Sequence, residues 1–205
     1  MTHDAVTVFA SAARSFAQLI REIPPDRWDG PGLGEWNLRS LVGHTSRALS
    51  TVISYANKPA DQEDIGTPQD YYVRVTATAL GIDPKDVVER GRQAARELGD
   101  DPEAAIDELV ERALDVITAA DNPLIQVIGG LGIRLHTYLP TRTFELAVHS
   151  LDIARAVRIS FPLPDEVIEA ATVLAARIAV ASGTGETVLM ALTGRTTLPP
   201  SFSIV

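Results

Sequence analysis

The 205-residue sequence contains no cysteine. A chain without cysteine forms no disulfide, holds no iron–sulfur cluster or cysteine-type zinc finger, and has no cysteine nucleophile. Any metal site must therefore be built from histidine and carboxylate side chains. Any thiol that takes part in a reaction must come from outside the protein.

Basic residues are also scarce. Lys and Arg number 18 against 27 Asp and Glu, which gives a formal net charge of −9. Affinity for nucleic acid comes mainly from clustered Lys and Arg, so we expect no nucleic-acid partner. The negative charge also disfavours anionic substrates, unless a local arginine offsets the overall field.

Long hydrophobic runs are missing as well. The most apolar stretch, residues 167–181, is interrupted by Glu169 and Arg177. It is also shorter than the ~20 residues that a membrane-spanning helix needs. The N-terminus lacks the basic segment and apolar run of a secretory signal. We therefore expect no membrane partner and a soluble cytoplasmic protein.

What the sequence does contain is helical periodicity. Nearly every long segment has the apolar spacing of an amphipathic helix, and no stretch shows convincing strand alternation. Residues 68–80 are ambiguous, because their β-branched side chains lower helix propensity although their position favours a short helix. The simplest architecture is an all-α, up-and-down four-helix bundle with additional short helices and an irregular C-terminal tail over residues 192–205.

Caps and breakers predict where some of these helices begin and end. Asn37 is a predicted N-cap, and Gly99 is predicted just after a helix end. Pro140 is predicted to open a helix that runs to about Ile159. The glycines of residues 129–132 mark a turn and lack the spacing of a phosphate-binding loop.

Three ionisable residues share one stripe of the helix predicted to follow Pro140. At 100° per residue, with Glu145 as zero, His149 lies at about +40° and Asp152 at about −20°. Val148 also lies beside this stripe, so it is not simply the solvent face. A carboxylate and an imidazole among apolar neighbours need partners, and a divalent metal satisfies both. Asp152 would then orient the ligand imidazole, although the same spacing is also common in surface or structural pairs.

His44 is the histidine best placed to supply a third ligand. It lies within the apolar stripe of the second predicted helix, whereas His3 is near the terminus and His136 is in or near the glycine-rich turn. It is interpreted either as a core histidine bonded to a neighbour or as a residue that faces Glu145 and His149. Two histidines and one carboxylate would form a facial set with open positions, which is typical of a catalytic metal.

Two segments about 100 residues apart carry these candidate ligands. They are Trp36-Asn37-Leu38-Arg39-Ser40-Leu41-Val42-Gly43-His44-Thr45 and Tyr138-Leu139-Pro140-Thr141-Arg142-Thr143-Phe144-Glu145-Leu146-Ala147-Val148-His149-Ser150-Leu151-Asp152-Ile153-Ala154. Both resemble segments of the mycothiol-dependent maleylpyruvate isomerase family, which belongs to the DinB/YfiT-like metal-binding bundles. The segment Ala191-Leu192-Thr193-Gly194-Arg195 also resembles one found near the end of many members.

The resemblance implies a bundle that holds a divalent metal through His44, Glu145 and His149. Zinc is the expected metal, with nickel and iron as alternatives. The implied reaction uses mycothiol or another low-molecular-weight thiol to attack a small electrophile, in a transferase or isomerase type of chemistry. On this basis we expect residues 1–160 to form the metal-binding bundle and residues 161–205 to form a C-terminal helix and tail packed on it.

The sequence also departs from the isomerase. The isomerase carries a further C-terminal domain, whose arginine helps to bind the acidic substrate, and this chain is too short to hold all of that domain. Arg195 is one candidate to replace that arginine. Arg142 is another, since it lies at about +60° on the ligand helix, although it fits a surface ion pair equally well. Isomerisation of maleylpyruvate is therefore not carried over to this chain.

Two other functions stay open at this stage. The chain is also consistent with a non-catalytic metal-binding bundle that acts as a sensor or interaction protein. It is consistent, too, with a bundle that holds no metal, in which the three residues form a buried polar network and the helices form a homodimer face.

Overall fold

The computed structural model describes residues 4–75, 81 and 83–205 of the chain. α-Helices and 3₁₀ turns make up 66% of the described residues, which confirms the all-α prediction. The elements are α1 (Ala5–Arg21), the 3₁₀ turn η1 (Pro25–Arg27), α2 (Leu38–Ala56), α3 (Pro68–Arg74), α4 (Pro84–Glu97), α5 (Pro102–Ala119), β1 (Leu124–Gln126), the 3₁₀ turn η2 (Ile128–Gly130), β2 (Gly132–Arg134), α6 (Leu135–Val157), α7 (Asp165–Ala181) and α8 (Gly185–Leu192).

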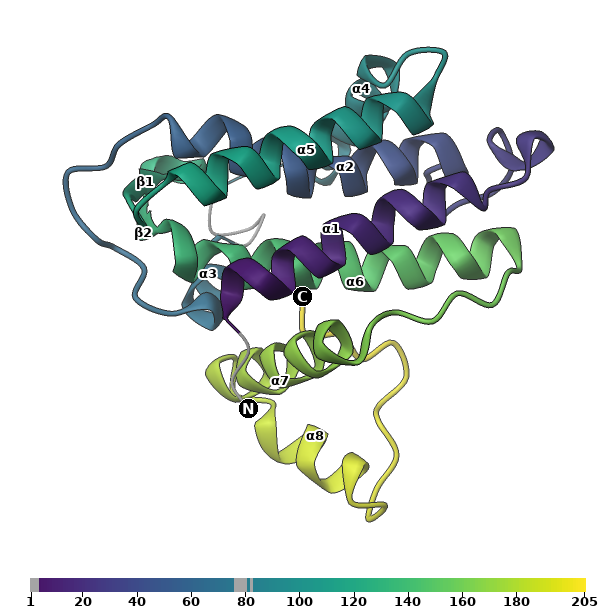
Figure 1. The fold of residues 1–205 in the computed structure, drawn as a ribbon. Coiled ribbons are helices and arrows are strands. Elements are labelled where there is room, and N and C mark those ends of the chain that lie inside the picture. The colour runs from purple at the N-terminus through teal and green to yellow at the C-terminus, as the bar shows by residue number, and fades with distance from the viewer. Residues whose placement is uncertain (1–3, 76–80, 82) are drawn as a thin grey trace.

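The four long helices α1, α2, α5 and α6 form the bundle (Figure 1). α5 and α6 each contact both α1 and α2, so α1 and α2 lie on opposite corners. α1 and α6 run in one direction and α2 and α5 in the other (Figure 1). α2 and α5 can be parallel because α3 and α4 lie between them in the chain and return it to the end of the bundle where α2 begins. The core between the helices is fully buried and includes Phe9, Phe16, Leu41, Leu49, Ile106 and Tyr138.

Two of the predicted helix ends are confirmed. The side chain of Asn37 accepts a hydrogen bond from the backbone N–H of Ser40, and α2 begins at the next residue, Leu38. Gly99 follows the end of α4 with a φ of +66°, a conformation that favours glycine. The short helix expected over residues 68–80 is observed as α3 over Pro68–Arg74. Residues 76–80 lie outside the described part of the chain.

The predicted start of α6 at Pro140 is wrong, because the helix begins at Leu135 and carries Pro140 inside it. The N–H of Leu135 donates to the carbonyl of Pro123, and the N–H of His136 donates to the side chain of Asn122. These bonds give acceptors to the first two N–H groups of the helix, so it can begin five residues before Pro140. The extra turn places His136 on α6.

The glycine-rich segment is a turn, as predicted, but it lies in a small hairpin that the sequence analysis does not predict. β1 pairs antiparallel with β2, and Ile125 is opposite Ile133. Gly129 and Gly130 occupy the turn with φ values of +78° and +77°. Strands of three residues are too short to show an alternating pattern, and this hairpin is held by its fully buried isoleucines.

α4 packs on α2 through a contact that requires glycine. A Cβ atom at Gly43 would lie 2.3 Å from the backbone nitrogen of Ala95, so a larger residue does not fit without movement of the helices. This close approach brings α4 to the first half of α2, which carries His44, and to Trp36, which stands just before that helix.

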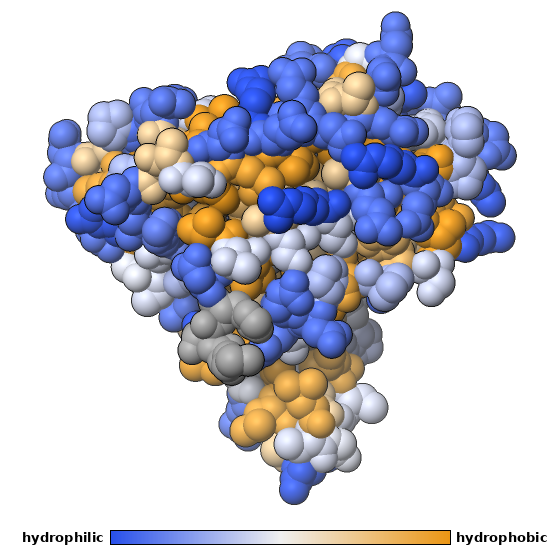
Figure 2. Space-filling model, in the orientation of Figure 1, coloured by the Kyte–Doolittle hydropathy of each residue, from blue (hydrophilic) through white to orange (hydrophobic). Residues whose placement is uncertain are grey.

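The C-terminal elements cover one side of the bundle. α7 contacts α1, α3 and α6, whereas α8 contacts α7 and extends away from the bundle (Figure 1). Val180, Leu189 and Leu192 are exposed there, and Figure 2 shows apolar side chains gathered at this end of the molecule. After Leu192 the chain is irregular. None of the helices in the described ranges has the length and apolar character to span a membrane.

Candidate metal centre

His44, Glu145 and His149 meet between α2 and α6. One ligand atom from each of the three residues lies within 4.8 Å of the other two. His149 Nε2 is 3.5 Å from Glu145 Oε2, and the two side chains are 15% and 25% exposed. The antiparallel packing of α2 on α6 therefore brings together the three residues that the sequence analysis proposes as ligands.

Asp152 contacts the opposite nitrogen of the His149 ring. Its Oδ2 is 3.2 Å from His149 Nδ1, one turn farther along α6. Burial alone would lower the pKa of His149, but the hydrogen bonds with Asp152 and Glu145 raise it to about 9. In the metal-free protein, His149 is therefore protonated at neutral pH and lies between two carboxylates.

The two oxygens of Glu145 have different partners. The hydroxyl of Tyr72, on α3, donates to Oε1 at 3.0 Å, while Oε2 faces His149. Burial alone would raise the pKa of Glu145, but the His149 hydrogen bond and the charge of Arg142 lower it to about 2. Glu145 is therefore ionised, with one oxygen held by Tyr72 and the other directed toward the histidines.

His44 has a buried nitrogen that lacks a partner. Its Nδ1 atom has no hydrogen bond with any residue in the described ranges. Burial, and then the charge of His149, lower the pKa of His44 to about 4, so its ring is neutral at pH 7. A neutral imidazole with an unpartnered buried nitrogen is in the state that a metal ligand requires.

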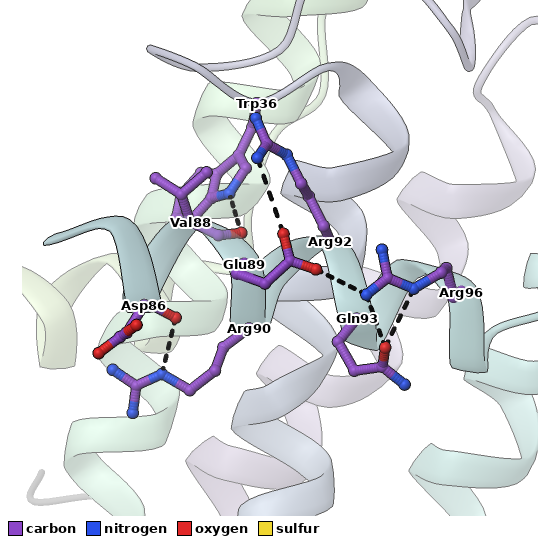
Figure 3. Close-up of polar contacts among 8 residues, drawn as sticks. All are labelled: Trp36, Asp86, Val88, Glu89, Arg90, Arg92, Gln93 and Arg96. Atoms are coloured by element: carbon purple, nitrogen blue, oxygen red, sulfur yellow. Dashed lines mark hydrogen bonds and ion pairs between the residues drawn. The ribbon is translucent and has the colours of Figure 1, made fainter. Parts of the chain in front are cut away.

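Trp36 covers the His44 ring and connects it to α4. The two rings are stacked, with centroids 4.3 Å apart, and the indole Nε1 donates to the carbonyl of Val88 (Figure 3). Glu89, beside Val88, pairs with Arg92 and Arg96 on the outer face of α4 (Figure 3). Trp36 is therefore a direct neighbour of the site, held between the His44 ring and α4.

Arg142 is buried beside the three residues, and the predicted surface ion pair is not observed among the residues that the structure describes. The residue is 9% exposed, and its Cζ atom lies over the rings of Tyr71 and Tyr138, at 5.3 and 4.8 Å from the ring centroids. It lines a cavity of about 80 Å³ together with His44 and Glu145.

Arg195 lies elsewhere. It follows α8 in the exposed C-terminal segment, where its guanidinium donates to the carbonyl of Thr193. It is not among the residues that line the cavity at His44 and Glu145. The structure thus brings Arg142, but not Arg195, to the site.

The donor set fits a divalent metal. Two imidazoles and one ionised carboxylate converge. The alternative interpretation of His44, a core histidine bonded to a neighbour, would require a partner for its buried nitrogen, but Nδ1 has none among the described residues. Three protein ligands leave positions for exogenous ligands, whereas structural zinc is usually held by four.

The family model of the mycothiol maleylpyruvate isomerase N-terminal domain matches residues 9–154 of this chain. The chain belongs to that family. The match covers the bundle from α1 to α6 and includes His44, Glu145 and His149. This match confirms the resemblance that the two segments show to the mycothiol maleylpyruvate isomerase family. Neither the curated proteins nor the solved structures yield a significant match to the chain.

Tyr72 and Trp36 contact the candidate ligands, although neither is predicted as a site residue from the sequence. Tyr72 precedes a β-branched stretch of ambiguous structure, and only the packing of α3 on α6 brings its hydroxyl to Glu145. Trp36 stands just before the N-cap of α2, where a packing role is the simpler interpretation. In the family segment that begins at Trp36, its position eight residues before His44 is the signal that could have linked the two.

Proposed function

We propose that this chain is a divalent-metal-dependent enzyme that uses mycothiol, or another low-molecular-weight thiol, to attack a small electrophile in a transferase or isomerase type of reaction. The observation that carries the proposal is the convergence of ligand atoms from His44, Glu145 and His149, together with the lack of a hydrogen-bond partner at His44 Nδ1. Membership of the mycothiol maleylpyruvate isomerase N-terminal domain family supports mycothiol as the thiol.

His44, Glu145 and His149 would hold the metal, for which we propose zinc, with nickel and iron as alternatives. When bound, such a metal supplies a Lewis acid that lowers the pKa of a coordinated thiol, so that a thiolate is present at neutral pH. The thiol must be exogenous, because the chain has no cysteine.

The other residues of the site orient these ligands. Asp152 accepts a hydrogen bond from His149 Nδ1–H, so that Nε2, on the side of Glu145, is the nitrogen that gives up its proton and binds the metal. Tyr72 occupies Glu145 Oε1 and leaves Oε2 available. Trp36 excludes water from one face of His44. We infer that these three contacts preorganise the donor atoms before the metal arrives.

Metal analysis of the purified protein tests the first part of the proposal. We expect about one equivalent of zinc, nickel or iron, measured by mass spectrometry of the metal content after reloading and desalting. His149→Ala should lose this metal, whereas the matched change His136→Ala, on the same helix, should retain it. Less than a tenth of an equivalent after reloading would contradict a metal-dependent function.

Thiol consumption tests the second part. The metal-loaded protein is assayed with mycothiol, glutathione and bacillithiol against a panel of small electrophiles, and His44→Ala serves as the inactive control. We expect thiol loss with at least one pair. A metal-loaded protein that consumes none of the three thiols would favour the alternative, a non-catalytic metal-binding bundle that senses or mediates an interaction.

A further inference from the structure

Arg142 is a buried cation that uses few of its hydrogen-bond donors. The residue is 9% exposed, and its Nε–H donates to Thr141 Oγ1 at 3.0 Å. Its Nη1 and Nη2 atoms make no hydrogen bond or ion pair with any residue in the described ranges. A guanidinium carries five N–H donors, so four of them are left without a protein acceptor.

The tyrosine rings around Arg142 support the charge without neutralising it. Tyr71 and Tyr138 present their rings to the guanidinium in cation–π contacts. A buried charge normally needs an ionic or hydrogen-bonded counterpart, because desolvation costs more than ring contacts return. The charge of Glu145 also acts on Arg142, but the two side chains form no hydrogen bond, so the Nη donors still lack an acceptor among the described residues.

The cavity that Arg142 lines is otherwise poor in negative charge. Its polar walls include Arg47, Thr51 and Tyr55, and Glu145 is its only acidic residue among those described. Both Glu145 oxygens face other partners, namely Tyr72 and His149. With a divalent metal bound, that ion and the two arginines would carry four positive charges against the two of Glu145 and Asp152. A site of net positive charge thus lies inside a chain whose net charge is −9.

We propose that this cavity is a subsite for a carboxylate, which Arg142 binds through the Nη donors that the protein leaves free. The planar fork of a guanidinium matches the two oxygens of a carboxylate. The cavity volume of about 80 Å³ fits a carboxylate and the carbon next to it. An aromatic ring is too large, since benzene occupies an engineered cavity of ~150 Å³.

This inference extends the proposed function, because the carboxylate would belong to one of the two reactants that meet at the metal. Either the electrophile or the thiol would then carry a carboxylate group. Carboxylate binding itself needs no turnover, so it is tested by a binding measurement that stands apart from the thiol assay.

The binding test uses the zinc-loaded full chain and acetate as the probe. In ¹H–¹⁵N spectra we expect acetate to shift the Arg142 Nε–Hε resonance and nearby α6 amides saturably. Acetamide, which has the same shape without the charge, should not shift them. Arg142→Met should weaken acetate binding at least about tenfold, the factor expected when a charge-assisted hydrogen bond is lost. The exposed control Arg177→Met should bind acetate as the unmodified chain does.

Three results would overturn the subsite. One is an Arg142 resonance that acetate leaves unchanged, and another is an equal response to acetate and acetamide. The third is undiminished acetate binding in a folded Arg142→Met variant, which would place the acetate on the metal. If Arg142→Met does not fold, Ala48→Leu, which fills the cavity wall and retains Arg142, should abolish the acetate shifts. Persistence of those shifts in Ala48→Leu would equally overturn the proposal.

Kinetics then identify which reactant supplies the carboxylate. If it belongs to the electrophile, Arg142→Met should lower kcat/KM for the free acid and spare its methyl ester. If it belongs to the thiol, the loss should appear with glutathione and not with cysteamine, which lacks a carboxylate. Acetate binding without turnover would support the carboxylate subsite and contradict the proposed enzymatic function. Turnover without acetate binding would support the enzymatic function and contradict the subsite.

Discussion

The Nδ1 atom of His149 lies 3.2 Å from Oδ2 of Asp152, on the side of the ring that faces away from Glu145. This contact fixes the ring orientation and its tautomer. A neutral His149 that donates Nδ1–H to Asp152 presents the Nε2 lone pair to the centre formed with His44. The relationship makes Asp152 the orienting partner of a ligand rather than a ligand itself.

Asp152→Asn should weaken zinc binding by about 10- to 100-fold, the usual cost when the hydrogen-bond partner of a ligand histidine is changed. The affinity is measured by competition with a chromophoric chelator. Asp115→Asn, an exposed change of the same kind on α5, is the matched control and should leave the affinity unchanged. Equal zinc affinity in the two variants would show that Asp152 does not orient the ligand.

Tyr72→Phe removes the hydroxyl that donates to Glu145 Oε1 and contacts the Thr141 carbonyl, both at 3.0 Å. Burial raises the pKa of Tyr72 well above its ordinary value, so the hydroxyl remains a donor at every working pH. We expect the variant to lose about 1–3 kcal/mol in free energy of unfolding, because a buried carboxylate oxygen loses its partner. Zinc affinity should also fall about tenfold.

Chemical denaturation and chelator competition measure these two effects. Tyr55→Phe provides the control, since Tyr55 lines the same cavity but its hydroxyl has no hydrogen bond to Glu145. A Tyr72→Phe protein that binds zinc as tightly as Tyr55→Phe would remove Tyr72 from the site.

Gly91→Ala should disturb the site from α4. A Cβ at Gly91 would lie 2.8 Å from Trp36 Nε1, so the indole must move from its place on His44. Overpacking of this kind costs about 1–3 kcal/mol in free energy of unfolding. Gln93→Ala, on the exposed face of the same helix, should change it by less than about 0.5 kcal/mol. Near-ultraviolet circular dichroism should report the displaced tryptophan in Gly91→Ala alone, and an unchanged spectrum would argue against the tight contact.

The core of the site could be predicted from the sequence because it depends on short-range geometry. Glu145 and His149 are one helical turn apart, so any helix through them places both side chains on one face. His44 lies within an apolar stripe, so the helix that carries it turns this residue toward the core. Neither inference depends on where the helices begin, and the wrong start of α6 at Pro140 left the ligand assignment unaffected.

The remainder of the site depends on contacts between distant segments. Tyr72 reaches Glu145 because α3 packs on α6, and no local pattern near residue 72 predicts that contact. The position of Arg142 at about +60° was compatible with both surface and interior, and the rings of Tyr71 and Tyr138 decide for the interior. The extra turn of α6 has the same origin, since Asn122 and Pro123 accept its first N–H groups from outside the helix.

The stability of the metal-free protein should fall as the pH rises above neutrality. The pKa of His149 is about 9 in the folded protein, against an ordinary value of 6.5. A raised pKa means that protonated His149 stabilises the fold fully below pH 6.5, and that this contribution is lost as the pH rises toward 9. We expect the free energy of unfolding to decrease by a few kcal/mol across this interval, measured by urea denaturation in the presence of a chelator.

His149→Gln should remove most of this slope, because glutamine keeps a polar side chain but does not titrate. Zinc affinity should change in the opposite sense and rise from pH 6.5 to 9, since the proton on His149 competes with the metal. At pH 7 zinc binding should therefore release about one proton, which calorimetry in buffers of different ionisation enthalpy detects. A metal-free protein whose stability is flat over this interval would show that Glu145 and Asp152 do not hold a protonated His149 between them.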